Sequence, residues 1–507
     1  MTFLGIDIGT SAVKAIVIDS DGAVIASASA SYPIYHPHPG WSEQEPLDWW
    51  EGTASAVRAL GDAAANVAGI GLSGQMHGLV LLDDETAASK GAKRAALRRA
   101  LLWNDQRTAP QCERIEAAFG GREGSVRAVG NAPLPGFTLP KLLWVREHDA
   151  EEYTRARVFL MPKDYIRFLL TGQIATDVGD ASGTLLFDPA ARAWNLACAA
   201  KVGVASSLLP TVLESGDIAG RLTSHAAAAL GLREGLPVVA GSGDNMMGAI
   251  GAGVVSPGLA VVTVGTSGVV YSHSDARRLD ISPNAPAGRV HTMCAATGRA
   301  HSPRGWCVTG CSLSSGGSFA WAKENVWPET AYERLLEEAA TAPAGCEGLV
   351  FLPYLTGERC PYPDPAARGC WAGLTARHTR AHMVRAVLEG VACSLAAIVE
   401  IQRDAGVSIS RLRLGGGGAK SALWRQILAD VIGEPLHLPN TEEGPAFGAA
   451  LLARSTVVGD MPIGALCERV ITETSTTNPR DPDAYRTVRK LNEQAYDAIK
   501  RHTELMR

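Results

Sequence analysis

The sequence lacks several features that would place it in a common class of protein. Its ten cysteines form no CxxC pair and no cluster with histidine at metal-ligand spacing, so we expect reduced thiols and no zinc site. No apolar run approaches the ~18 residues of a membrane-spanning helix. The first residues carry no basic leader, and an acid, Asp7, interrupts their apolar run, which argues against a signal peptide. We therefore expect a cytoplasmic protein without a membrane span.

An excess of positive charge is also missing. The 47 lysine and arginine residues stand against 52 aspartate and glutamate residues, for a formal net charge of −5 at pH 7. This balance favours neither a nucleic-acid nor a membrane partner. One basic cluster is present, but no aromatic residue separates its members, and a solvated helix face explains it without nucleic acid. Its members are Lys90, Lys93, Arg94, Arg98 and Arg99.

The chain is long, and one of its sequence patterns occurs twice. With 507 residues, 46% of them hydrophobic, it is expected to form two or three domains. Apolar runs at residues 3–8 and 13–18 flank the polar tip Gly9-Thr10-Ser11, which predicts a β-hairpin. The same pattern recurs about half the chain later, around Gly265-Thr266-Ser267. We interpret this recurrence as a duplication, with one domain at residues 1–246 and the other at 247–507.

Helix-like and strand-like patterns alternate in both halves, which predicts an α/β fold with a cleft between the domains. Helices are expected at residues 46–60, 379–404, 423–432 and 483–505, and further strands at residues 67–72, 79–82, 101–103 and 412–414. The last of these helices could pack on either domain, including the first.

A P-loop is absent, because residues 418–421 lack a glycine directly before the lysine. The two hairpin tips can hold phosphates instead, since glycine lets backbone N–H groups converge on an anion and hydroxyl groups add donors. Asp7 lies beside the first tip and would repel phosphate unless a divalent cation intervened. It is therefore a candidate for binding Mg²⁺ through water. A tip with only a structural role is the alternative.

Two further glycine-rich segments are candidates for the active site. Residues 415–418 are four successive glycines between a strand and a helix, where a backbone contact with adenine or phosphate is expected and a flexible turn is the alternative. Residues 241–245 (GSGDN) place Asp244 near the predicted domain boundary. A carboxylate there can accept the proton of an attacking alcohol, although aspartate in such a loop can also be a simple turn former.

Two strand ends carry groups that suit a hydroxyl-rich ligand. Gln75-Met76-His77-Gly78 separates two predicted strands, at the kind of position where α/β proteins bind ligands. Trp103-Asn104-Asp105 ends another strand and could supply a flat wall with polar groups. A structural histidine and a core tryptophan are the alternatives at these positions.

Taken together, these segments resemble the FGGY family of carbohydrate kinases. One family signature matches at residues 136–147, and the second runs from Gly369 through Trp371 and His382 to Gly390. Residues 75–78 and 102–105 are similar to the branch of the family that acts on D-xylulose. So are residues 162–165, 177–183 and 352–359. The departures are Ser242, Cys360 and Tyr362, where glycine, threonine and histidine are more usual.

The resemblance implies an actin-like fold, the superfold shared by sugar kinases, heat-shock chaperones and actin, with two RNase H-like domains and ATP between the hairpins. It further implies Mg²⁺, a homodimer, and phosphorylation of D-xylulose to its 5-phosphate with Asp244 as the base. The expected sugar contacts are Gln75, Met76, His77, Trp103, Asp244 and Asn245. The expected ATP contacts are Gly9, Thr10, Ser11, Lys14, Gly265, Thr266, Ser267, Gly316, Gly416, Gly417, Gly418 and Ser421. The alternatives are a kinase for ribulose, xylitol or glycerol, and an actin-like ATPase without a sugar substrate.

Overall fold

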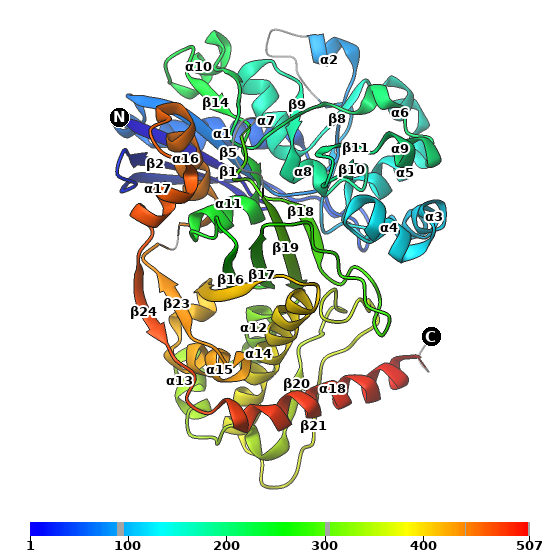
Figure 1. Cartoon of the computed structure of the whole chain (residues 1–507), viewed down its shortest axis with the longest axis vertical. Coiled ribbons are helices and arrows are strands. Elements are labelled where there is room, and N and C mark those ends of the chain that lie inside the picture. The colour runs from blue at the N-terminus through cyan, green and yellow to red at the C-terminus, as the bar shows by residue number, and fades with distance from the viewer. Residues whose placement is uncertain (89–95, 300–304, 442, 505–507) are drawn as a thin grey trace.

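The protein is built around two large mixed β-sheets, one in each half of the chain (Figure 1). The structure is a computed structural model and describes residues 1–88, 96–299, 305–441 and 443–504. Three members of the basic cluster, Lys90, Lys93 and Arg94, lie outside the described residues. Within those residues no helix is both long and apolar enough to cross a membrane.

The strands of the first half are β1 (Thr2–Ile8), β2 (Ala12–Asp19), β3 (Val24–Ser31), β4 (Glu43–Gln44), β5 (Val67–Gly74), β6 (Val80–Leu82), β7 (Ala100–Leu101), β8 (Val158–Leu160), β9 (Ala175–Asp177), β10 (Phe187–Asp188), β11 (Ala193–Trp194), β12 (Thr211–Leu213), β13 (Ile218–Arg221), β14 (Pro237–Val239) and β15 (Ser242–Gly243). Its helices are α1 (Pro46–Ala59), α2 (Asp84–Ala88), α3 (Ala109–Phe119), α4 (Gly121–Val129), α5 (Thr138–His148), α6 (Ala150–Arg155), α7 (Pro162–Thr171), α8 (Val178–Ser182), α9 (Leu196–Lys201), α10 (Ser224–Leu230) and α11 (Asp244–Gly251).

The strands of the second half are β16 (Gly258–Val264), β17 (Gly268–Ser274), β18 (His291–Cys294), β19 (Trp306–Ser312), β20 (Val350–Leu352), β21 (Cys370–Ala372), β22 (Ile409–Gly415), β23 (Leu436–Pro439) and β24 (Glu473–Thr477). Its helices are α12 (Gly316–Asn325), α13 (Tyr332–Ala339), α14 (Arg380–Asp404), α15 (Ala422–Ile432), α16 (Gly444–Val458), α17 (Ile463–Val470) and α18 (Pro482–Glu504).

The two large sheets share one topology. The first has the order β13-β14-β5-β1-β2-β3, with β15 also paired to β5, and the second has the order β18-β19-β17-β16-β22-β23-β24. In each sheet an antiparallel hairpin, β1–β2 or β16–β17, is followed by a parallel neighbour of its first strand, β5 or β22. This repeat confirms the predicted α/β fold and its duplicated hairpins, and it is the arrangement expected of an actin-like protein.

The elements predicted from apolar periodicity are present. The helices predicted at residues 46–60, 379–404, 423–432 and 483–505 correspond to α1, α14, α15 and α18. The strands predicted at residues 79–82 and 101–103 correspond to β6 and β7, which do not belong to the large sheet. β6 pairs with β8 and β7 pairs with β4, each in a small separate sheet. They therefore flank the first large sheet instead of extending it.

Helix α16 comes late in the chain but packs on the first sheet, where Figure 1 shows it beside the N-terminal strands. Its apolar residues share a core cluster with Phe3 and Ile16. The approach is close at two glycines: a Cβ atom on Gly5 would lie 1.9 Å from the Ala446 carbonyl oxygen, and one on Gly71 would lie 1.9 Å from the Ala449 carbonyl oxygen. Only glycine permits the helix backbone to lie this near the strands.

The last helix, α18, packs on the second half, against α14, α15 and β20. The alternative in which it returns to the first domain is therefore wrong, and α16 is the helix that crosses back. The ring of Tyr496 in α18 stacks on Tyr362 with their centroids 3.6 Å apart. Tyr362, one of the departures from the family pattern, thus provides an aromatic contact for this helix.

The described part of the basic cluster is engaged within the protein. Arg98 donates to Asp149 at 2.7 Å, and the guanidinium carbon of Arg99 lies 3.8 Å from the centroid of the Tyr35 ring. These contacts give both side chains a structural role and agree with the interpretation of the cluster without nucleic acid. All ten cysteines are free thiols.

We predict that Gly5→Ala lowers the free energy of unfolding by ~1–3 kcal/mol, because the added methyl group forces α16 away from β1. Thermal unfolding followed by circular dichroism measures the change as a lower midpoint. The matched control is Gly464→Ala on α17, where a Cβ atom would meet no atom within 4 Å. Equal midpoints for the two variants would contradict the close seating of α16.

Candidate active site

The first hairpin tip is held by side chains from several elements. The backbone nitrogen of Gly9 donates to the Ala12 carbonyl oxygen at 3.1 Å, and the Tyr32 hydroxyl donates to the Gly9 carbonyl oxygen. The Thr10 carbonyl oxygen accepts a hydrogen bond from Gln44 Nε2 at 2.7 Å. A tip fixed in this way presents its remaining donors in one arrangement, as an anion site requires.

Two carboxylates from different halves of the first domain share the site beside this tip. Asp7 is the last residue but one of β1 and accepts a hydrogen bond from Ser73 Oγ at 2.7 Å. Asp244 begins α11 and accepts one from Asn245 Nδ2 at 3.2 Å. Burial and, to a lesser degree, the charge of Asp7 raise the pKa of Asp244 to about 7, against the lowering effect of its hydrogen bonds with Asn245. Burial also raises the pKa of Asp7 to about 6, against the lowering effects of Ser73 and Lys14. A perturbed pair of this kind is typical of a catalytic site.

The loop that carries Asp244 is anchored to a buried polar cluster. Ser242 Oγ and Ser215 Oγ each donate to Asp177 Oδ2 at 2.7 Å. Asp177 is in turn 3.0 Å from Lys163 Nζ. Ser242, one of the departures from the family pattern, therefore adds a hydrogen bond that glycine could not make, and it fixes the residues just before the candidate base.

Lys163 excludes a metal ion from this cluster. Asp164, Asp177 and Asp180 have carboxylate oxygens close enough to bind one ion, but the ammonium group lies 2.5, 3.0 and 3.3 Å from them and occupies their centre. Burial alone would lower the pKa of Lys163, yet the three carboxylates raise it. The cluster is thus an internal ion pair network that supports the loop.

The second hairpin tip meets two other predicted ATP contacts. The backbone nitrogen of Gly316, at the start of α12, donates to the Gly265 carbonyl oxygen at 2.7 Å. A Cβ atom on Gly416 would lie 2.6 Å from the Val264 carbonyl oxygen, whereas one on Gly417 would meet no atom within 4 Å. The tip, the start of α12 and the glycine run therefore lie together, with open space at Gly417.

Two of the predicted ATP contacts have partners within the protein. Ser421 is the N-cap of α15, where its hydroxyl accepts from the Trp424 backbone nitrogen at 3.2 Å. Lys14 Nζ lies 2.6 Å from Glu443 Oε2, just before α16. ATP would have to draw Lys14 away from this partly exposed carboxylate, and exposed ion pairs of this kind are weak.

Cys311, near the end of β19, is influenced by groups from both hairpin regions. Burial raises the pKa of its thiol. The charges of Glu358 and Asp244 add to this rise, whereas Arg359 and a hydrogen bond with Ser267 lower the pKa. Ser267 belongs to the second hairpin tip, and Asp244 lies beside the first. Cys311 also pairs with Val269 in β17, two residues after the second tip.

His77 occupies a strained and well-supported position. Its φ angle of 66° is unusual for a residue with a side chain, and its carbonyl oxygen is held by Lys141 Nζ at 2.9 Å and Thr138 Oγ1 at 3.1 Å. The ring nitrogen Nδ1 lies 3.1 Å from the Gly183 carbonyl oxygen. Because a carbonyl only accepts, Nδ1 carries the proton, and Nε2 of the neutral ring is left as an acceptor.

The charge state of His77 agrees with this assignment. Burial lowers the pKa of His77 well below its usual value, with Lys141, His291 and Arg359 adding to the effect. A neutral imidazole with a free acceptor nitrogen can accept a hydrogen bond from a sugar hydroxyl.

The other predicted sugar contacts are Trp103, Asn245, Met76 and Gln75, and each of them makes a contact within the protein. Trp103 Nε1 donates to Thr10 Oγ1 at 2.9 Å, so the predicted sugar wall is joined to the phosphate tip. Asn245 Nδ2 lies 3.5 Å from Met76 Sδ. Gln75 is 1% exposed and donates to Gln44 Oε1 at 2.9 Å. This placement gives Gln75 a supporting position behind the first tip.

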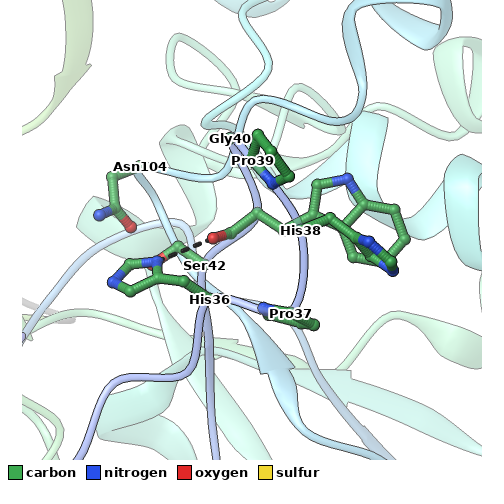
Figure 2. A pocket seen from close by; sticks show the side chains of 8 residues that line it. His36, Pro37, His38, Pro39, Gly40, Ser42 and Asn104 are labelled. Atoms are coloured by element: carbon green, nitrogen blue, oxygen red, sulfur yellow. Dashed lines mark hydrogen bonds between the residues drawn. The ribbon is translucent and has the colours of Figure 1, made fainter.

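A separate hollow of about 470 Å³ lies next to Asn104. Figure 2 shows that residues 36–42 line the hollow, with His36 hydrogen-bonded to the Trp41 carbonyl oxygen. Neither candidate carboxylate, Asp7 or Asp244, belongs to its wall. The hollow is therefore distinct from the site built around the two hairpin tips.

Comparison with known proteins agrees with this geometry. The model of the FGGY family of carbohydrate kinases, N-terminal domain, matches residues 2–251, and that of the C-terminal domain matches residues 260–456. The chain belongs to the FGGY family of carbohydrate kinases. It is 41% identical over 455 residues to a xylulose kinase from Bacillus subtilis, covering 89% of this chain and 87% of that protein. It is 39% identical over 456 residues to a xylulose kinase from Escherichia coli, covering 89% of each.

A solved structure extends the likeness to the whole fold. The crystal structure of a xyloylose kinase from Brucella ovis matches with a TM-score of 0.89 at 35% sequence identity, and the match covers 99% of each chain. The protein is thus an FGGY carbohydrate kinase with the two-domain fold of that family, and an ATPase without a sugar substrate is not supported.

Sequence reasoning missed several residues that build the site. Lys141 and Thr138 belong to the first family signature, yet their contact with the His77 carbonyl depends on a chain reversal that no local pattern shows. Lys163 and Asp177 likewise had no assigned role before the structure joined them to Ser242. A buried lysine close in sequence to several aspartates was the available signal for this cluster.

We predict that Gly183→Ala raises the KM for the sugar about 2- to 10-fold, the loss expected from weakening one neutral hydrogen bond. A Cβ atom at this position would lie 2.5 Å from His77 Nδ1 and Cε1, so the ring must move. Steady-state kinetics with each substrate varied in turn measures the effect, and the KM for ATP should stay within twofold of wild type. An unchanged sugar KM would show that the position of the His77 ring does not matter for binding.

Proposed function

We propose that the protein transfers the γ-phosphoryl group of ATP to the terminal hydroxyl of D-xylulose, giving D-xylulose 5-phosphate. The single observation that carries this proposal is that the candidate sugar contacts His77 and Trp103 and the candidate base Asp244 lie around the first hairpin tip, which is the candidate phosphate site. The xylulose kinases to which the chain is similar support the choice of substrate.

Asp244 is proposed as the general base. Its pKa of about 7 lets the carboxylate accept the proton of the attacking hydroxyl at neutral pH. Asn245 orients one carboxylate oxygen, and Ser242 fixes the preceding backbone through Asp177. The loose transition state of phosphoryl transfer gains most from positioning, so this support of the base matters as much as its charge.

Asp7 is proposed to hold Mg²⁺ through water. The chemistry of the site fits a hard divalent cation, because two carboxylates of raised pKa lie close together and oxygen ligands are those that Mg²⁺ prefers. Bound Mg²⁺ would neutralise charge on the ATP phosphates. The protein's own contribution is to orient Asp7 through Ser73, which donates to one of its oxygens.

The two hairpin tips, Gly316 and residues 416–418 are proposed to bind ATP, and Lys14 to reach its phosphates. Because the tips belong to different sheets, we also propose that the domains at residues 1–246 and 247–507 close over both substrates and exclude water. Helix α16 lies on the first sheet, so it should move with the first domain. A homodimer in the cytoplasm completes the proposal, on the resemblance to the family.

We predict that Asp244→Asn lowers kcat by ~10²-fold or more while ATP binding stays near wild type, because a base acts in the transition state. In the wild-type protein, log(kcat/KM) for the sugar should fall with a slope of about one as pH drops below about 7, since protonation removes the base. A stopped assay across pH 5.5–9 measures both effects. Activity within tenfold of wild type in the variant would remove Asp244 from this role.

We predict that D-xylulose has the highest kcat/KM in a panel with D-ribulose, xylitol and glycerol, measured as ADP release. His77→Ala should raise the KM for D-xylulose about 2- to 10-fold through loss of the Nε2 acceptor, with little change in the KM for ATP. If another member of the panel led D-xylulose by tenfold, the substrate would be reassigned although the protein would remain a carbohydrate kinase.

A further inference from the structure

Arg359 is a charged side chain that the proposed transfer leaves without a role. It lies between β20 and β21 in the second half and is half-buried. Among the residues that the structure describes, none receives a hydrogen bond or an ion pair from its guanidinium group. Partial burial of a charge without a partner is unfavourable, and the N–H donors of this guanidinium group are available to a ligand.

The backbone of Arg359 is firmly held at the second hairpin. The carboxylate of Glu358 accepts hydrogen bonds from Ser312 Oγ at 2.8 Å and from the backbone nitrogens of Leu313 and Arg359 at 2.9 and 2.7 Å. Ser312 pairs with Gly268, directly after the second tip. Arg359 is therefore fixed to the phosphate side of the site by its main chain, and only its side chain is left to reach elsewhere.

That side chain reaches the sugar wall of the first half. Its Nη2 atom lies 3.8 Å from the position that a Cβ atom on Gly136 would take, and the same position is 2.3 Å from the Trp103 carbonyl oxygen. Lys141 Nζ joins the carbonyl oxygens of Gly136 and His77, at 2.7 and 2.9 Å. Arg359 thus ends beside the group of residues that carries Trp103 and His77.

The neighbours of Arg359 do not balance its charge. Burial lowers the pKa of both His77 and His291, the latter to about 3, so both rings are neutral. The guanidinium group therefore lies near the sugar wall, beside two neutral imidazole rings.

We propose that Arg359 is a sugar-binding residue supplied by the second half, donating to the carbonyl and adjacent hydroxyl oxygens at the end of the ketose remote from Asp244. This inference rests on the proposed function. A guanidinium group offers parallel N–H donors and no acceptor, which suits a ketone oxygen and its neighbour. It also joins the sugar to the half that carries the second phosphate tip, so that sugar binding favours domain closure.

The test compares Arg359→Gln with wild type, using D-xylulose and xylitol, which lacks the ketone. We expect the KM for D-xylulose to rise roughly 10- to 100-fold, the loss of hydrogen bonds to a charged group, with the KM for ATP within twofold. The preference for D-xylulose over xylitol, as a ratio of kcat/KM values, should fall about tenfold or more. Arg368→Gln, an exposed arginine of the same segment, is the matched control and should match wild type.

Arg359→Lys keeps the positive charge but loses the fork of donors, so it should give an intermediate KM and serves if the glutamine variant does not fold. A sugar KM within twofold of wild type in the folded variants, or equal rises in the KM for sugar and ATP, would overturn the inference while leaving the proposed function intact. A wild-type protein that does not phosphorylate D-xylulose would overturn both.

Discussion

Two carboxylates that repel each other, Asp7 and Asp244, are half-buried in the same site, and several hydrogen bonds of the surrounding structure hold them there. Burying both carboxylates is unfavourable, as their raised pKa values show. The fold offsets this through hydrogen bonds from Ser73 and Asn245 and through the tether of Ser242 to Asp177. A relaxed loop would separate the two groups, so the rigidity of β15 and the start of α11 is a condition of the chemistry.

The residues expected to bind phosphate and those expected to bind sugar are hydrogen-bonded to each other. The hydrogen bond from Trp103 to Thr10 connects the sugar wall to the first tip, and Gln75 supports the same tip from behind. A ligand that displaces Trp103 will therefore also disturb the tip that is expected to bind phosphate. The hydrogen bond is therefore a direct contact between the residues expected to bind sugar and those expected to bind phosphate.

The sequence was sufficient to predict what depends on local pattern. The hairpins around residues 9–11 and 265–267 and the helices α1, α14, α15 and α18 follow from apolar periodicity and turn residues, whereas the role of Asp244 as the base stays a prediction. Contacts between distant segments were beyond such reasoning. The hold of Lys141 on the His77 carbonyl, the Lys163 cluster and the crossing of α16 to the first sheet depend on tertiary packing, which leaves no periodic signal. For the same reason Gln75 has a supporting position that its neighbours in sequence did not indicate.

The crossing of α16 also bears on how the chain is made. The face of β1 and β5 that carries Gly5 and Gly71 is covered by residues 444–458, which leave the ribosome long after the strands themselves. During synthesis, the first sheet must wait with that apolar face uncovered until most of the second half has been translated. The first sheet can thus complete its packing only after residue 458 has been synthesised, although its own strands come first in the sequence.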